Sequence, residues 1–119
     1  MKTKKPAKLL RVNLSRDDLD SLAKIAQLNG FNAGSKRMRS QACRFAIRHQ
    51  ANNLRASLLS RMVLRSVARD DTAGNETWAF FCDAATRRDL SKIKEFHGLS
   101  RFSEAVRFAI RQQAKCDAM

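Results

Sequence analysis

The chain has 119 residues, of which 24 are Lys or Arg and 11 are Asp or Glu, giving a formal net charge of +13. This length suits about one domain, and the positive charge favours a polyanionic partner, nucleic acid ahead of an acidic membrane, over a basic protein with no such partner. No stretch approaches the roughly eighteen apolar residues of a membrane span, and three cysteines without a CxxC spacing argue against a disulfide framework.

Residues 1–8 are predicted to form a basic arm. The segment contains four lysines and has neither the apolar run nor the cleavage site of a signal peptide. We expect the arm to follow the phosphates of a bound nucleic acid through Lys4, Lys5 and Lys8.

Residues 9–53 are predicted to form a first structural unit, which opens with a strand. Leu10, Val12 and Leu14 alternate with polar residues, and this two-residue period is typical of a half-buried strand. The apolar set must face the core, so the opposite face points outward. The outward residues are Leu9, Arg11 and Asn13.

Two helices complete this unit. Ser15 is a good N-cap, because its hydroxyl can accept a hydrogen bond from an amide of the first turn, and Gly30 is a natural helix stop. After a loop, a second helix is expected to begin near Ser35 and to run past Ile47, with Cys43 as a small buried residue.

Residues 54–76 are predicted to form a partly helical linker, and residues 77–115 a second unit like the first. In that unit "TWAFFCDA" is the strand candidate, Thr86 is the expected N-cap of the next helix, Gly98 ends it, and Ser100 caps the last helix. We expect one compact domain, because each unit alone is near the size at which a hydrophobic core is too small.

The phase of the second strand stays open from the sequence. Counting back from Leu90 directs Phe81, Asp83 and Ala85 toward the core, but a buried Asp83 without a partner would be costly. The other phase buries a better apolar set and needs a β-bulge before Thr86. That set is Trp78, Phe80 and Cys82. Neither phase directs an Arg or Lys outward, so the two strands should not contact a ligand equivalently.

The two units share a repeated phrase. The pentapeptide RFAIR occurs at Arg44–Arg48 and again at Arg107–Arg111, an offset of 63 positions (107 − 44). The two expected caps, Ser15 and Thr86, are 71 positions apart (86 − 15), so the first unit should contain eight extra residues in its loop. Such a repeat indicates two copies of one supersecondary unit.

An alternating strand, a capped amphipathic helix, a glycine stop and a second helix together resemble the ribbon-helix-helix superfamily of DNA-binding proteins. The stretches that carry the resemblance are LLRVNLSRDDLDSLAKIAQLNG and HGLSRFSEAVRFAIR. It implies a mainly α fold in which two antiparallel strands form a ribbon that enters the DNA major groove. Members are normally intertwined dimers, so this chain is expected to be a monomer whose two units form a pseudo-dimer with a shared core.

The resemblance also implies two kinds of contact with double-stranded DNA. Bases are expected to meet Leu9, Arg11 and Asn13, because Arg suits guanine and Asn suits adenine. A phosphate is expected at the N-terminus of each second helix, where free amides and the helix dipole attract anions. The residues expected there are Ser35, Lys36, Arg37 and Arg39 in the first unit and Ser100 and Arg101 in the second.

More narrowly, the tandem layout and basic bias are similar to those of T-DNA transfer enhancers from the virC operons of Agrobacterium Ti plasmids. This likeness implies an accessory protein of the bacterial cytoplasm that binds enhancer DNA near the T-DNA border, where chains associate with one another and with other T-DNA processing proteins. It also implies that the chain is the C-terminal part of a longer protein. The alternatives are a ribbon-helix-helix transcriptional repressor and a protein-interaction module without DNA specificity.

An enzyme is not expected from this sequence. There is no nucleophile–base constellation, no Gly-rich phosphate loop and no clustered set of His and Cys. We therefore predict no catalytic residues, no metal site and no cofactor.

Overall fold

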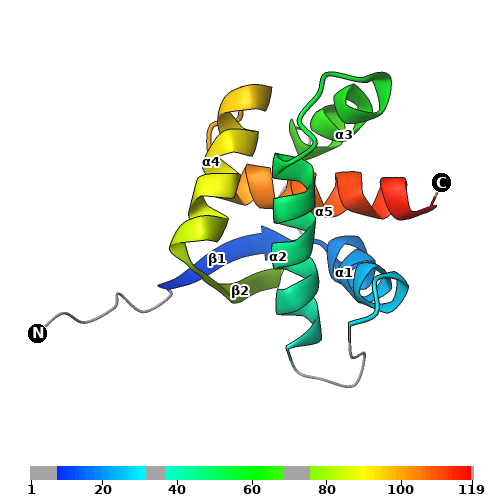
Figure 1. Cartoon of the computed structure of the whole chain (residues 1–119), viewed down its shortest axis with the longest axis vertical. Helices are drawn as coiled ribbons and strands as arrows, with labels where there is room; N and C mark the ends of the chain where they lie inside the picture. Colours follow the sequence, from blue (N-terminus) through cyan, green and yellow to red (C-terminus); the bar gives the residue numbers. More distant parts are fainter. Residues whose placement is uncertain (1–7, 32–36, 69–75, 119) are drawn as a thin grey trace, which may run out of the picture.

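The computed structural model describes residues 8–31, 37–68 and 76–118 (Figure 1). Within them the fold is mainly helical, with a two-stranded antiparallel ribbon, as predicted. In chain order the elements are β1 (Lys8–Leu14), α1 (Arg16–Leu28), α2 (Met38–Ala51), α3 (Leu58–Ala68), β2 (Glu76–Cys82), α4 (Ala84–His97) and α5 (Phe102–Ala118). The helix α3 lies within residues 54–76, the segment predicted as a partly helical linker.

The two halves of the chain meet in the ribbon. β1 pairs with β2 along its whole length, from Lys8 opposite Cys82 to Leu14 opposite Glu76. Lys8 was expected in the basic arm, but its backbone belongs to β1, because pairing with β2 extends the strand one residue toward the N-terminus.

One face of the ribbon packs against the helices. Val12 and Leu14 are buried as the alternation predicted, and Leu10 is half-buried. In β2, Phe80 and Cys82 are buried and Trp78 is half-buried, so the phase that buries Phe81, Asp83 and Ala85 is wrong. The remaining core consists mainly of helical residues that include Leu22, Ile25, Ile47, Leu90, Ile93 and Ile110.

The start of α4 corrects a predicted cap. The N-cap is Asp83, whose carboxylate accepts a hydrogen bond of 2.8 Å from the backbone amide of Thr86. Thr86 itself is buried in the first helical turn. Because the helix begins three residues earlier than expected, the ribbon pairs without the predicted β-bulge. Asp83 is exposed rather than buried.

The corrected cap also changes the length of the inserted loop. Ser15 caps α1 as predicted, in a capping box with Asp18, and Asp83 follows Ser15 by 68 positions (83 − 15). The glycines that follow α1 and α4, Gly30 and Gly98, share this offset and have positive φ angles of 79° and 68°. The first unit therefore has five extra residues in its loop (68 − 63), not eight.

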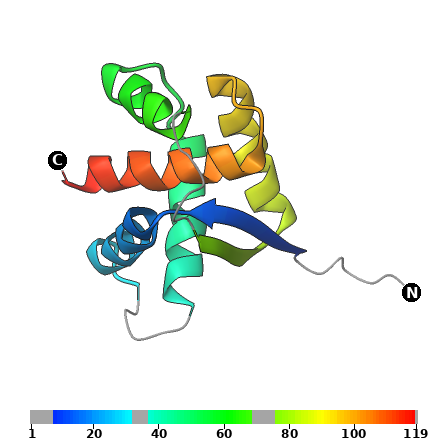
Figure 2. The same cartoon turned by 180° about the vertical axis from the view of Figure 1, so that it is seen from behind.

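The helices α2 and α5 cross in the middle of the molecule (Figures 1 and 2). At this crossing Gln50 donates a hydrogen bond of 2.8 Å to Gln113, and both side chains are buried. The two glutamines are 63 positions apart, which is the offset of the repeated phrase. Equivalent residues of the two copies thus meet each other. Figure 1 shows α1 and α4 on opposite sides of α2.

The helix α3 lies on α5 at the end away from the ribbon (Figure 1). It buries Ser60, Val63 and Val67, whereas Leu58 and Met62 are exposed. Among the described residues, no helix is both long and apolar enough to cross a membrane.

Candidate nucleic-acid interface

The ribbon has an open face that no described helix covers. We call it the outer ribbon face, and it consists of three pairs of opposed residues. The pairs are Leu9 with Phe81, Arg11 with Ala79, and Asn13 with Thr77. All of these side chains are exposed except that of Ala79, which is half-buried. The outward direction of Leu9, Arg11 and Asn13 is therefore confirmed, whereas their contact with bases stays a prediction.

The outer ribbon face changes in character along its length. At one end Thr77 donates a hydrogen bond of 3.2 Å to the side-chain oxygen of Asn13, so that the Asn13 amide group is oriented but still able to donate. Arg11 stands in the middle beside the small Ala79. The other end is apolar, because Leu9 and Phe81 stand opposite each other.

Two arginines from the repeated phrase hold the edges of the ribbon. Arg44 on α2 donates a 3.2 Å hydrogen bond to the carbonyl of Phe81, and Arg107 on α5 donates one of 3.2 Å to the carbonyl of Asn13. Each arginine thus binds a strand of the other half. These residues were missed as functional candidates, although a repeated Arg within an apolar helical stripe was the available signal.

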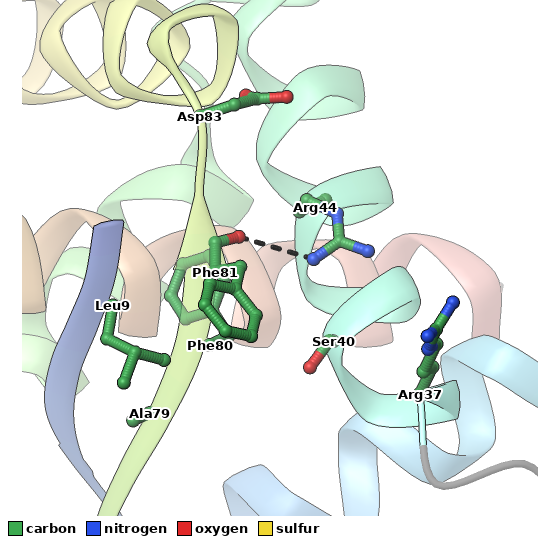
Figure 3. Close-up of a pocket in the computed structure, with 8 residues that line it drawn as sticks. All are labelled: Leu9, Arg37, Ser40, Arg44, Ala79, Phe80, Phe81 and Asp83. Carbon is green, nitrogen blue, oxygen red and sulfur yellow. Dashed lines mark hydrogen bonds between the residues drawn. The ribbon is translucent and has the colours of Figure 1, made fainter. Parts of the chain in front are cut away.

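A hollow of about 550 Å³ lies between the ribbon and α2. Figure 3 shows Ser40 and Arg44 on α2, and Arg37 at the start of that helix, on one side of the hollow, with the labelled residues of the two strands on the other. The strand residues that line it, and the cap of α4 beyond them, are Leu9, Ala79, Phe80, Phe81 and Asp83. The hollow therefore combines an apolar floor with basic side chains.

The N-terminus of α2 borders this hollow. The helix begins at Met38 with Arg37 at the N-cap, rather than near Ser35, and the Arg37 side chain makes no capping hydrogen bond. Arg39 is exposed in the first turn. The other residues expected at this end or in the arm, Lys4, Lys5, Ser35 and Lys36, lie outside the described residues.

The N-terminus of α5 is built differently. The helix begins at Phe102, and the carbonyl of Arg101 accepts its first hydrogen bond, so Ser100 lies one residue before the N-cap position. The carboxylate of Glu104 accepts hydrogen bonds of 2.9 and 3.1 Å from the amides of Ser100 and Arg101. Phosphate contacts by Ser100 and Arg101 stay a prediction, but these two amides are bound by a carboxylate of the chain itself.

One carboxylate lies at the rim of the hollow. Asp83 lines it, and hydrogen bonding from Thr86 holds the pKa of Asp83 below its ordinary value. Asp83 is therefore ionised at neutral pH. Its carboxylate accepts the hydrogen bond from the Thr86 amide and interacts favourably with the N-terminal dipole of α4.

Two of the three cysteines, Cys43 and Cys82, are buried. Burial raises the pKa of the Cys43 and Cys82 thiols, so neither is a ready nucleophile. In the described part of the chain, no three His, Cys, Asp or Glu side chains are grouped so that they could hold a metal ion.

Comparison of the chain with protein-family models, curated proteins and solved structures found no match.

Proposed function

We propose that this protein is a double-stranded DNA-binding module that inserts the outer ribbon face into the major groove. The observation that carries the proposal is the exposed Arg11, which stands in the middle of an uncovered two-stranded ribbon. A ribbon of this width fits the major groove, where an Arg can bind guanine through two hydrogen bonds. The net charge of +13 supports a polyanionic ligand.

We further propose that the two strand–helix–helix halves are ribbon-helix-helix units that form a pseudo-dimer within one chain. Three contacts support this. Gln50 meets Gln113 at the repeat offset, and Arg44 and Arg107 each bind a strand of the other half. Because each strand already has its partner in the same chain, a second chain is not needed to complete the ribbon.

The DNA-binding proposal is tested by selecting binding sites from a random duplex pool and titrating the selected duplex at several salt concentrations. If about six phosphates are neutralised, the logarithm of the affinity should fall with the logarithm of salt at a slope of about −5. A selected site that is not palindromic is expected, because the outer faces of β1 and β2 carry different residues. Failure to enrich any sequence together with a flat salt dependence would contradict the proposal.

The pseudo-dimer proposal is tested by sedimentation of the free protein. At micromolar concentration it should sediment as one chain of 13.5 kDa. An obligate dimer with exchanged strands would contradict it, whereas association of two chains on neighbouring DNA sites would not.

The likeness to T-DNA transfer enhancers supplies the biological setting that we propose. In that setting the protein binds enhancer DNA beside the T-DNA border and works with other processing proteins. Footprinting on border-flanking DNA and on the promoter of its own gene distinguishes this from a repressor, because a repressor should protect the promoter instead.

A further inference from the structure

The apolar end of the outer ribbon face lies outside the hydrophobic core of the described residues. Leu9 is 48% exposed and Phe81 is 58% exposed, and the two residues stand directly opposite each other. Opposed side chains on one face of a ribbon have Cβ atoms about 5 Å apart, so these two form one continuous apolar surface. Single exposed apolar residues are common, but an opposed pair at one end of a candidate interface requires an explanation.

The surroundings of the pair indicate what kind of ligand covers it. Arg37 and Arg44 line the same hollow as Leu9 and Phe81, and with the one carboxylate there, Asp83, they leave a net positive charge. This lining favours a ligand that presents apolar groups to the ribbon and negative charge to α2. A second copy of this chain carries the same net charge of +13 and is therefore repelled overall. Duplex DNA has it, because the phosphates flank the groove.

Within the major groove only one base carries an apolar group on its edge. This group is the C5-methyl of thymine, and apolar side chains recognise it by contact. We propose that Leu9 and Phe81 read thymine in the DNA site through this methyl group, an inference that rests on the proposed DNA binding.

The spacing of the strand positions the thymine relative to the other contacts. Alternate residues of a strand are about 6.7 Å apart. Successive bases on one DNA strand are separated by about 3.4 Å. If β1 follows the groove, the thymine lies about two base pairs from the base that Arg11 meets and about four from the base that Asn13 meets, on the Leu9 side.

The test removes the methyl group and nothing else. A duplex obtained by selection is resynthesised with deoxyuridine in place of each thymine in turn, which leaves the hydrogen-bonding edge unchanged. The wild-type protein should bind about four-fold more weakly when the methyl under the pair is removed, which corresponds to about 0.8 kcal/mol for one buried methyl group. The double variant Leu9→Ala/Phe81→Ala, which removes both side chains of the pair, should bind the thymine and uracil duplexes equally.

The matched control is Phe96→Ala. Phe96 has the same ring, is 48% exposed, and lies on α4 rather than on the ribbon. The Phe96→Ala protein should still bind the uracil duplex about four-fold more weakly than the thymine duplex.

The possible failures are distinct. If the wild type binds duplexes strongly but ignores every uracil, the thymine inference is overturned while DNA binding stands. A uracil penalty that persists in the double variant Leu9→Ala/Phe81→Ala would also overturn it. If no duplex is bound, the proposed function itself fails, and the apolar pair becomes a surface for a protein partner.

Discussion

The repeated pentapeptide RFAIR makes different contacts in the two halves of the molecule. In the second half, Arg111 forms a two-pronged ion pair with Asp18, with distances of 2.8 and 2.9 Å, and Asp18 is only 2% exposed. Its repeat equivalent, Arg48, is exposed, and the position that corresponds to Asp18 at the offset of 68 is Thr86, which has no charge. The same arginine is thus part of the fold in one half and a surface cation in the other.

The helix starts differ in a similar way. Glu104 of α5 corresponds to Gln41 of α2 at the offset of 63. Only the former brings a negative charge to the amides at its helix start. A symmetric homodimer must use each residue twice, whereas a chain with two copies can change one copy alone. The proposed pseudo-dimer can therefore hold a phosphate more strongly at α2 than at α5.

The largest expected difference between the halves concerns folding. Arg111→Met should lower the free energy of unfolding by about 3 kcal/mol, because it leaves the buried Asp18 without its counter-charge. Arg48→Met should change it by less than about 0.5 kcal/mol, as is usual for an exposed side chain. Urea denaturation followed by circular dichroism measures both. Equal effects would mean that the ion pair does not distinguish the halves.

The next difference concerns the strands. Arg11→Ala should weaken binding to the selected duplex by about 1–3 kcal/mol, the range for one good base contact. Binding to a scrambled duplex should fall much less, because phosphate contacts remain. The control is Arg61→Ala on α3, away from the ribbon, which should spare the preference for the selected duplex. If Arg11→Ala weakens binding to both duplexes equally, the ribbon does not distinguish one DNA sequence from another.

A smaller difference concerns the helix caps. Asp83→Ala should destabilise the fold by about 1 kcal/mol through loss of the N-cap of α4. Because the pKa of Asp83 is lowered in the folded protein, the unfolded chain takes up the proton first as the pH falls. The stabilisation is therefore present above the ordinary pKa of 3.8 and is lost as the pH falls through the lower folded value.

Asp83→Ser provides the comparison, because a serine hydroxyl caps without titrating. Urea denaturation at pH 7 and at pH 3 should show that the wild type loses more stability in acid than Asp83→Ser does. An identical loss in both proteins would show that the Asp83 carboxylate contributes nothing to acid sensitivity.

The smallest expected effect comes from a substitution that makes the N-termini of α2 and α5 alike. Glu104→Gln removes the negative charge at α5 but keeps an oxygen that can accept from the two amides. Affinity for selected and scrambled DNA should rise together by about 0.3–1 kcal/mol, the range for a charge at a helix terminus. The reverse exchange, Gln41→Glu, should lower both. Titrations at two salt concentrations measure these changes, and unchanged affinity would indicate that α5 does not approach a phosphate.

Features that depend on a few neighbouring residues could be predicted from the sequence. The alternation of Leu10, Val12 and Leu14 predicted both the strand and its buried face, and Ser15 predicted the start of α1. These predictions succeeded because strand period and capping are local properties. The offset of 63 also indicated two equivalent halves before any contact between them was known.

Where several residues could form the same interaction, such as a helix cap, only the tertiary structure shows which one does. Asp83 and Thr86 can both cap a helix, and the structure uses Asp83, which directly follows the last residue of β2, Cys82. The sequence did not indicate that Arg111 would reach Asp18, since 93 positions separate them. Nor did it show that Phe81 would stand beside Leu9, because that pair exists only through the register of two strands brought together by the shared core.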